Sequence, residues 1–159
     1  MLVATVGSFG YNLLLLLHIG AVIVGFGGVT LAGVYNRKAM KAGSAAANVS
    51  SVNLEVNKLA EYAVYAVLVF GLGLVGMSGG VYKFSQAWVS ASFALYIVIV
   101  GAAHGLLFPS HRKLNAALAA GGPTSPEVDD LNRRFAIGSA LVNVVLVAII
   151  VLMIWKPGA

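Results

Sequence analysis

Two histidines within long apolar stretches are the residues of this sequence best suited to chemistry. His18 lies in the charge-free run from Tyr11 to Tyr35, and His104 lies in a later run that ends at Pro109. Histidine is a common axial ligand of haem iron, and an ionisable residue inside a membrane helix is a candidate functional site. The alternative for each histidine is a neutral ring that is hydrogen-bonded within a helix bundle.

Met77 is the candidate for a second ligand beside His18, since methionine completes axial pairs with histidine in cytochromes. If the chain crosses a membrane in alternating directions, Met77 lies about as far from the outer surface as His18 does. Ser90 and Ser92, early in the next apolar run, share that outer layer. The sequence thus predicts a site formed by His18 with Met77 or a water molecule. Packing of Met77 beside glycines is the alternative.

His104 is expected in the inner half of the membrane, because it lies near the far end of its run. The predicted members of this inner layer are Tyr62, Tyr65, Ser139 and Asn143. A ligand role and a hydrogen bond to Ser139, Asn143 or a carbonyl are both open for the His104 ring. On ideal helices the two histidines differ in depth by roughly 20 Å, so one haem iron shared between them is not expected.

Four charge-free runs are long enough to cross a bilayer, whose ~30 Å hydrocarbon core requires about 20 residues of helix. They cover residues 11–35, 62–82, 84–109 and 135–155. The composition, 60% hydrophobic and only 9% charged, is that of a polytopic membrane protein. The sequence therefore predicts an all-α membrane four-helix bundle, a single domain over residues 1–159 that lies in the lipid bilayer.

The placement of charge predicts the orientation of this bundle. The connections 36–61 and 110–134 carry eight of the ten basic residues, and Lys83 and Lys156 are the other two. The positive-inside rule then puts both long connections in the cytoplasm and both termini outside. His111, which lies in the second basic connection, is expected to be solvated or to face lipid headgroups.

Several classes of function find no support in the sequence. The chain contains no cysteine, so disulfides, thiolate metal sites and iron–sulfur clusters are excluded within it. Its basic residues flank apolar runs, where topology and anionic lipid explain them without nucleic-acid binding. The acidic residues all lie in the long connections or at helix ends. A relay of carboxylates through the membrane is therefore not expected.

Small residues predict where the helices pack closely. One face of the first helix carries His18 and then only small side chains at helical spacing, namely Ala21, Gly25, Gly28 and Ala32. Such a stripe lets the backbone of a neighbouring helix approach closely in a membrane. Glycines four residues apart predict the same for the second and third runs, in the pairs Gly76 with Gly80 and Gly101 with Gly105.

Local signals also predict that helices continue beyond the apolar runs. Apolar residues recur at helical spacing in residues 50–61, which extend the second helix, and residues 111–120 extend the third. The glycines and proline at 121–123 end that extension. Ser125 and Pro126 have the pattern of an N-cap and a first helical position, so the fourth helix is expected to begin there, before the membrane.

The segment LLLLLHIGAVIVGFGG resembles the start of the CopD/HemJ-like membrane proteins. The similarity continues from Trp88 through AAHGLL and HRKL and ends at Trp155-Lys156-Pro157. The resemblance implies a four-helix protein of the bacterial inner membrane that holds haem b through His18, with His104 matching the third-helix histidine. HemJ itself oxidises protoporphyrinogen IX.

Two departures from HemJ disfavour that reaction for this chain. HemJ has a lysine soon after the tryptophan of its third helix, where this chain has Ser90-Ala91-Ser92. The Asn-Glu-x-Pro motif of its last helix has no counterpart here, since residues 139–143 read SALVN. The resemblance therefore implies a haem site without assigning the enzyme activity.

Three hypotheses for the function follow. The first is a redox or electron-transfer protein that holds haem b in its core through His18. The second is a non-catalytic accessory subunit, which packs in a larger respiratory or other membrane complex or in a homo-oligomer. The third is copper handling, for which the four methionines, spread along the chain, offer little.

Overall fold

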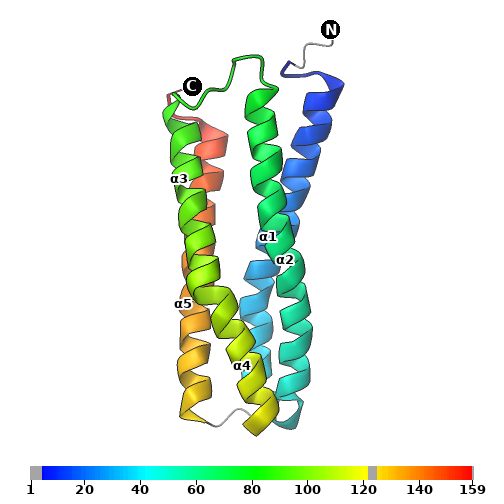
Figure 1. The fold of residues 1–159 in the computed structure, drawn as a ribbon, viewed down its shortest axis with the longest axis vertical. Coiled ribbons are helices and arrows are strands. Elements are labelled where there is room, and N and C mark those ends of the chain that lie inside the picture. Colours follow the sequence, from blue (N-terminus) through cyan, green and yellow to red (C-terminus); the bar gives the residue numbers. More distant parts are fainter. Residues whose placement is uncertain (1–4, 122–124, 159) are drawn as a thin grey trace.

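The computed structural model describes residues 5–121 and 125–158, and over these residues the chain forms a bundle of long helices (Figure 1). The helices are α1 (Phe9–Met40), α2 (Ala46–Gly76), α3 (Ala87–Ala102), α4 (Phe108–Gly121) and α5 (Pro126–Trp155). A 3-10 turn, η1 (Gly43–Ala45), precedes α2, and a π-helical turn, η2 (Ala103–Leu107), joins α3 to α4.

Because η2 links α3 and α4 without a break, the described residues form four continuous helical rods: α1, α2, α3 with α4, and α5. Each of the four is long and apolar enough to cross a membrane. The N-terminal end of α1 and the C-terminal end of α5 lie at the same end of the bundle (Figure 1). The predicted fold class is thus confirmed, with both termini on one side. That this side is the outer one stays a prediction.

The small stripe of α1 packs against α2, as predicted. A Cβ built on Gly28 would lie 2.7 Å from the Cβ of Ala60, and one built on Gly25 would lie 3.2 Å from the backbone nitrogen of Val64. Only glycine, whose side chain is a single hydrogen atom, allows the two backbones to come so close at these positions. One turn further along, the fully buried Ala32 accepts a hydrogen bond at 3.0 Å from the Asn53 side chain through its carbonyl oxygen.

The other two glycine pairs do not pack in this way. A Cβ on Gly76, Gly101 or Gly105 would meet no atom within 4 Å, and one on Gly80 would meet only the flexible end of Lys83. The sequence pattern was the same, but these glycines face out of the bundle or lie in a turn. The prediction of close packing at these pairs is therefore wrong for the single chain.

The connection between α2 and α3 is longer than the sequence predicted. The predicted span 62–82 stops being helical at Gly76, and α3 begins at Ala87 rather than at residue 84. Gly79 and Gly80 have φ angles of 63° and 85°, which no right-handed helix contains. The Ser78 hydroxyl accepts a hydrogen bond from the backbone N–H of Tyr82 and closes the turn.

The helical extensions beyond the apolar runs are confirmed. Helix α2 begins at Ala46, and α4 continues to Gly121; Gly122 and Pro123 lie outside the described residues. The Ser125 side chain accepts a hydrogen bond from the Val128 N–H, with Pro126 at the first turn of α5. Acidic Glu127 and Asp129 follow at the positive end of the helix dipole.

The π-helical turn has a cause in the sequence. Pro109 has no N–H to donate to the carbonyl of Gly105, and its ring crowds that carbonyl. The backbone N–H of Phe108 instead reaches the Ala103 carbonyl, five residues back. Gly138 of α5 permits the widened turn, because a Cβ there would lie 3.2 Å from the Leu107 backbone. This turn sets the direction of His104.

Candidate functional site

A cavity of about 440 Å³ lies between α1, α2, α3 and α5, in the half of the bundle that holds both termini. This volume falls within the range of roughly 300–1,000 Å³ that is typical of cofactor and small-molecule sites. The walls are mostly aliphatic and aromatic. The side chains on them that carry polar atoms are Tyr11, Asn12, His18, Tyr82, Trp88, Ser92, Tyr96 and Lys156.

His18 is held in this cavity in one tautomer. It is buried, and its Nδ1 lies 3.0 Å from the carbonyl oxygen of Val67. Since a carbonyl only accepts hydrogen bonds, Nδ1 carries the proton and the lone pair is on Nε2. The ring also lies against Gly71, where a Cβ would come within 3.2 Å of its Cε1 atom. Helix α2 therefore orients the His18 ring through one carbonyl and one glycine.

The predicted outer layer is only partly assembled. Ser92 lines the cavity with His18. Met77 is the residue that follows α2, and its methyl group lies 3.3 Å from where a Cβ on Gly10 would be, so it packs near the start of α1. The Ser90 hydroxyl donates to the Phe84 carbonyl, which ties it to the preceding loop. The methionine on the cavity wall is Met153, which sequence reasoning missed.

Polar groups gather where the cavity meets the loop after α2. Lys156 donates a hydrogen bond at 3.0 Å to the Tyr82 hydroxyl, and its Nζ lies 5.7 Å from the centre of the Trp88 ring. Trp88 and Ser92 are buried one turn apart on α3, and among the described residues neither Trp88 Nε1 nor Ser92 Oγ has a hydrogen-bond partner. A ligand in this cavity would thus meet a cation and two unpaired polar groups. The four-residue spacing of Trp88 and Ser92 was the signal in the sequence.

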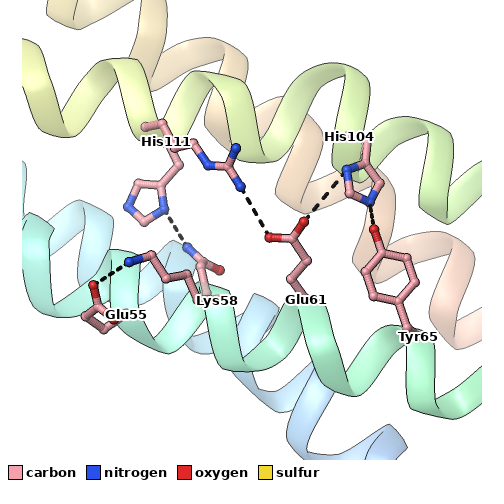
Figure 2. A network of polar contacts seen from close by, with 8 residues as sticks. Glu55, Lys58, Glu61, Tyr65, His104 and His111 are labelled. Carbon is pink, nitrogen blue, oxygen red and sulfur yellow. Dashed lines mark hydrogen bonds and ion pairs between the residues drawn. The ribbon is translucent and has the colours of Figure 1, made fainter.

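His104 meets one member of its predicted layer, Tyr65, and one residue that was not predicted there, Glu61. Figure 2 shows its ring between Tyr65, whose hydroxyl is hydrogen-bonded to His104 Nε2, and Glu61, whose Oε1 lies 3.8 Å from His104 Nδ1. Glu61 also meets Arg112 at 3.4 Å. A single carboxylate, directly before the second run, therefore lies beside an imidazole of the third run, a pairing between helices that the sequence analysis did not include.

Ser139 and Asn143, two further members of the predicted inner layer, contact α1 instead of His104. The Ser139 hydroxyl donates to the Val29 carbonyl, and Asn143 accepts a hydrogen bond from the Thr30 hydroxyl. Tyr62 is largely exposed. Of the two alternatives left open for His104, the hydrogen bond to Ser139, Asn143 or a carbonyl is not the one found, because its ring is hydrogen-bonded to Tyr65. The π-helical turn points His104 toward α2, and a pattern based on regular helices could not have shown this.

The two histidines are closer in depth than ideal helices predicted. His18 contacts Val67 and Gly71, and His104 contacts Glu61 and Tyr65. These contacts on α2 are centred six residues apart, which corresponds to ~9 Å of helix rise rather than roughly 20 Å. The histidines nevertheless face different spaces, because His18 lines the cavity and the His104 side chain is 41% exposed on the outside of the bundle.

His111 is buried rather than solvated, which corrects the third histidine prediction. It is 0% exposed, its Nδ1 lies 2.6 Å from the Asn57 side-chain nitrogen, and its ring centre lies 4.8 Å from that of Phe135. It belongs to a buried stripe at helical spacing with Leu107, Leu114 and Leu118. That stripe was visible in the sequence, but the neighbouring Arg112 and Lys113 suggested a solvated segment.

His111 predicts a dependence of stability on pH. It follows the charge-free run, and its burial lowers the pKa of the imidazole from 6.5 to about 4. Between pH 6.5 and about 4 the imidazole is therefore protonated in the unfolded chain and neutral in the folded chain. The free energy of unfolding is expected to fall as the pH drops from 7.5 to 5, because the unfolded chain then binds more protons. Thermal unfolding in detergent measures this. In His111→Gln the decrease should be smaller, and an equal decrease would contradict the assignment.

Metal ligands do not gather elsewhere in the part of the chain that the structure describes. Over residues 5–121 and 125–158, no three His, Asp or Glu side chains come together in a way that could hold a metal ion. A site built on a single histidine and a larger group, such as a macrocycle, is not of this kind. His18 is the residue of the cavity whose chemistry suits such a group.

Four apolar rods around a cavity define a polytopic integral membrane protein of the helix-bundle class. The chain belongs to the family described as "predicted integral membrane protein (DUF2269)", whose family model matches residues 12–157. No curated protein and no solved structure matches the chain. The family confirms the membrane assignment made from the four apolar runs.

Proposed function

We propose that this protein binds haem b in the cavity through His18 Nε2 and acts in electron transfer in a bacterial inner membrane. The orientation of the His18 ring is the observation that carries this proposal. Histidines that ligate metals commonly donate their other N–H to a carbonyl or carboxylate, which fixes the tautomer and the ring plane. The 3.0 Å contact from His18 Nδ1 to the Val67 carbonyl is an interaction of this kind.

The residues of the cavity suit the group. Its apolar walls favour a macrocycle, and its volume of about 440 Å³ lies in the range of cofactor sites. The unpaired Trp88 Nε1 and the Lys156 ammonium are donors that suit carboxylates at the edge of the ring. Met153, which lies on the cavity wall where Met77 does not, is the methionine that would help hold the group. When bound, haem supplies reversible one-electron exchange at its iron.

The resemblance to CopD/HemJ-like proteins supports the same residue, since their first-helix histidine matches His18 by position. The proposal does not extend to protoporphyrinogen oxidation. Ser92, in the stretch 90–92 where HemJ carries its lysine, is buried without a partner among the described residues, and Ser139 and Asn143 bond to α1. Copper handling is not proposed either, because Met153 is the single methionine on the cavity wall in the part of the chain that the structure describes.

An absorbance spectrum of protein purified from its native membrane tests the proposal. We expect a Soret band that shifts on reduction with dithionite and that is lost in His18→Ala. His104→Ala is the matched control, because it removes an imidazole outside the cavity and should keep the band. Colourless wild-type protein from haem-replete cells, or a Soret band that survives in His18→Ala, would overturn the assignment.

An accessory role is the second candidate, and the exposed glycines favour it. Gly101 and Gly105 face out of the bundle with open space beside them, where a helix of another subunit or a second copy of this chain could approach closely. Colourless protein that copurifies with a stoichiometric membrane partner, and loses it in Gly101→Leu, is the result expected for this role. The same substitution should leave a haem spectrum unchanged if haem binding is the function.

A further inference from the structure

The polar chain of Glu61, Tyr65 and His104 lies outside the cavity and has no part in the proposed haem site. His104 and Tyr65 belong to the apolar runs 84–109 and 62–82, and each is 41% exposed. In a bilayer, their exposed sides therefore face lipid. Polar groups in contact with lipid are costly, and where they occur they commonly mark a path for substrates, ions or protons.

Polar side chains lie between this pair and the basic connection 110–134. The Tyr65 hydroxyl and His104 Nε2 share one hydrogen bond (Figure 2). On the other side of the ring, Nδ1 lies 3.8 Å from Glu61 Oε1, a gap that is too long for a direct hydrogen bond. Glu61 Oε2 in turn lies 3.4 Å from Arg112. These polar contacts thus run from Arg112, in the basic connection 110–134, through Glu61 to the His104 imidazole and the Tyr65 phenol, which face lipid.

Aromatic surfaces surround the exposed end of the chain. The His104 and Tyr65 rings are stacked with an interplanar angle of 24° and a centroid distance of 5.8 Å. Phe108 meets the His104 ring edge-on at 5.3 Å, and Tyr62, 73% exposed, lies one turn before Tyr65. Phe108 is buried, so a flat ring that arrives from the lipid would meet the exposed Tyr62 and Tyr65 rings and a hydrogen-bond donor at the same place.

We infer that Tyr65 and His104 bind the head group of a membrane quinone. A quinone is a flat, lipid-soluble ring with carbonyl oxygens that accept hydrogen bonds and take up protons on reduction. The site offers each matching feature: access from lipid, a phenol or imidazole N–H for a carbonyl, and a carboxylate beside the basic connection. This inference does not depend on haem binding, because the pair lies outside the cavity.

Binding of decylubiquinone to the purified protein in phosphatidylcholine nanodiscs tests the inference. We expect saturable binding that weakens about fivefold in Tyr65→Phe, which removes one hydroxyl, and about tenfold or more in His104→Ala. Tyr62→Phe is the matched control, since it removes an exposed hydroxyl one turn away on the same helix and should bind like wild type. Far-UV circular dichroism and thermal midpoints check that each variant is folded.

Three results would overturn the inference. The first is no saturable binding to wild-type protein. The second is an equal effect of Tyr62→Phe and Tyr65→Phe. The third is that the purified protein binds phosphatidylglycerol or a second copy of the chain instead of the quinone, and that this binding is lost in His104→Ala. The haem proposal is tested separately in the same samples, because His18→Ala should lose the Soret band and still bind the quinone.

Discussion

Replacing Gly28 by leucine is expected to drive α1 away from α2 and to lower the free energy of unfolding by about 3 kcal/mol or more. A single Cβ at this position would already lie 2.7 Å from the Ala60 Cβ and 3.7 Å from its Cα, so nothing flexible can yield. The remaining atoms of leucine have no space between two backbones. The expected result is a protein that is poorly folded or that loses its His18 contacts to α2.

Gly27→Leu is the matched control for this change. The two glycines are adjacent, but a Cβ on Gly27 would meet no atom within 4 Å. Leucine also has a better helix propensity than glycine by somewhat less than ~1 kcal/mol. Unfolding in mixed micelles, followed by circular dichroism, should therefore show Gly27→Leu at or above wild type and Gly28→Leu well below. Equal stabilities would contradict the close contact between α1 and α2.

Replacing Phe135 by alanine is expected to destabilise the bundle by about 3–5 kcal/mol, the usual cost of removing a buried phenyl ring. Phe135 is 0% exposed and packs against the His111 ring in the half of the bundle opposite the termini. Its loss leaves a cavity beside a buried imidazole, where the polar ring would be poorly packed. The effect should therefore be largest on the contact between α4 and α5.

Ile137→Ala provides the comparison for Phe135→Ala. Ile137 lies two residues further along α5 and is 50% exposed, so its truncation removes little buried contact. We expect a change of about 0.5 kcal/mol or less, measured by the same unfolding assay. A small effect at Phe135, or an effect of similar size at both positions, would show that Phe135 is not part of the core.

The long helices could be predicted because the membrane imposes a local rule. A run without charge and of sufficient length predicts a crossing helix whatever its neighbours are, and Ser125 signals a helix start through its own hydrogen bond to Val128. The stripe ending at Ala32 was equally informative, since spacing alone puts these residues on one face. That face was found to be the one against α2.

What the sequence could not predict depends on contacts between helices and on departures from ideal geometry. The depth of His104 was counted along a regular helix from residue 84, but α3 begins at Ala87 and widens into a π-helical turn before Pro109. Glu61 meets His104 from another helix, and no spacing within one run could have shown this pairing. His111 is buried with Leu107, Leu114 and Leu118 on one helix face, whereas its position in the basic connection had predicted a solvated residue.

In the proposed function His18 offers Nε2 to a group in the cavity, and chemical rescue with imidazole tests this role. His18→Gly removes the imidazole side chain, and the space that it leaves has room for free imidazole. We expect His18→Gly to lack the Soret band and to regain it as imidazole is added in the presence of haem, with His104→Gly unaffected throughout. A Soret band in His18→Gly without imidazole, or no recovery at saturating imidazole in a folded protein, would contradict the claim.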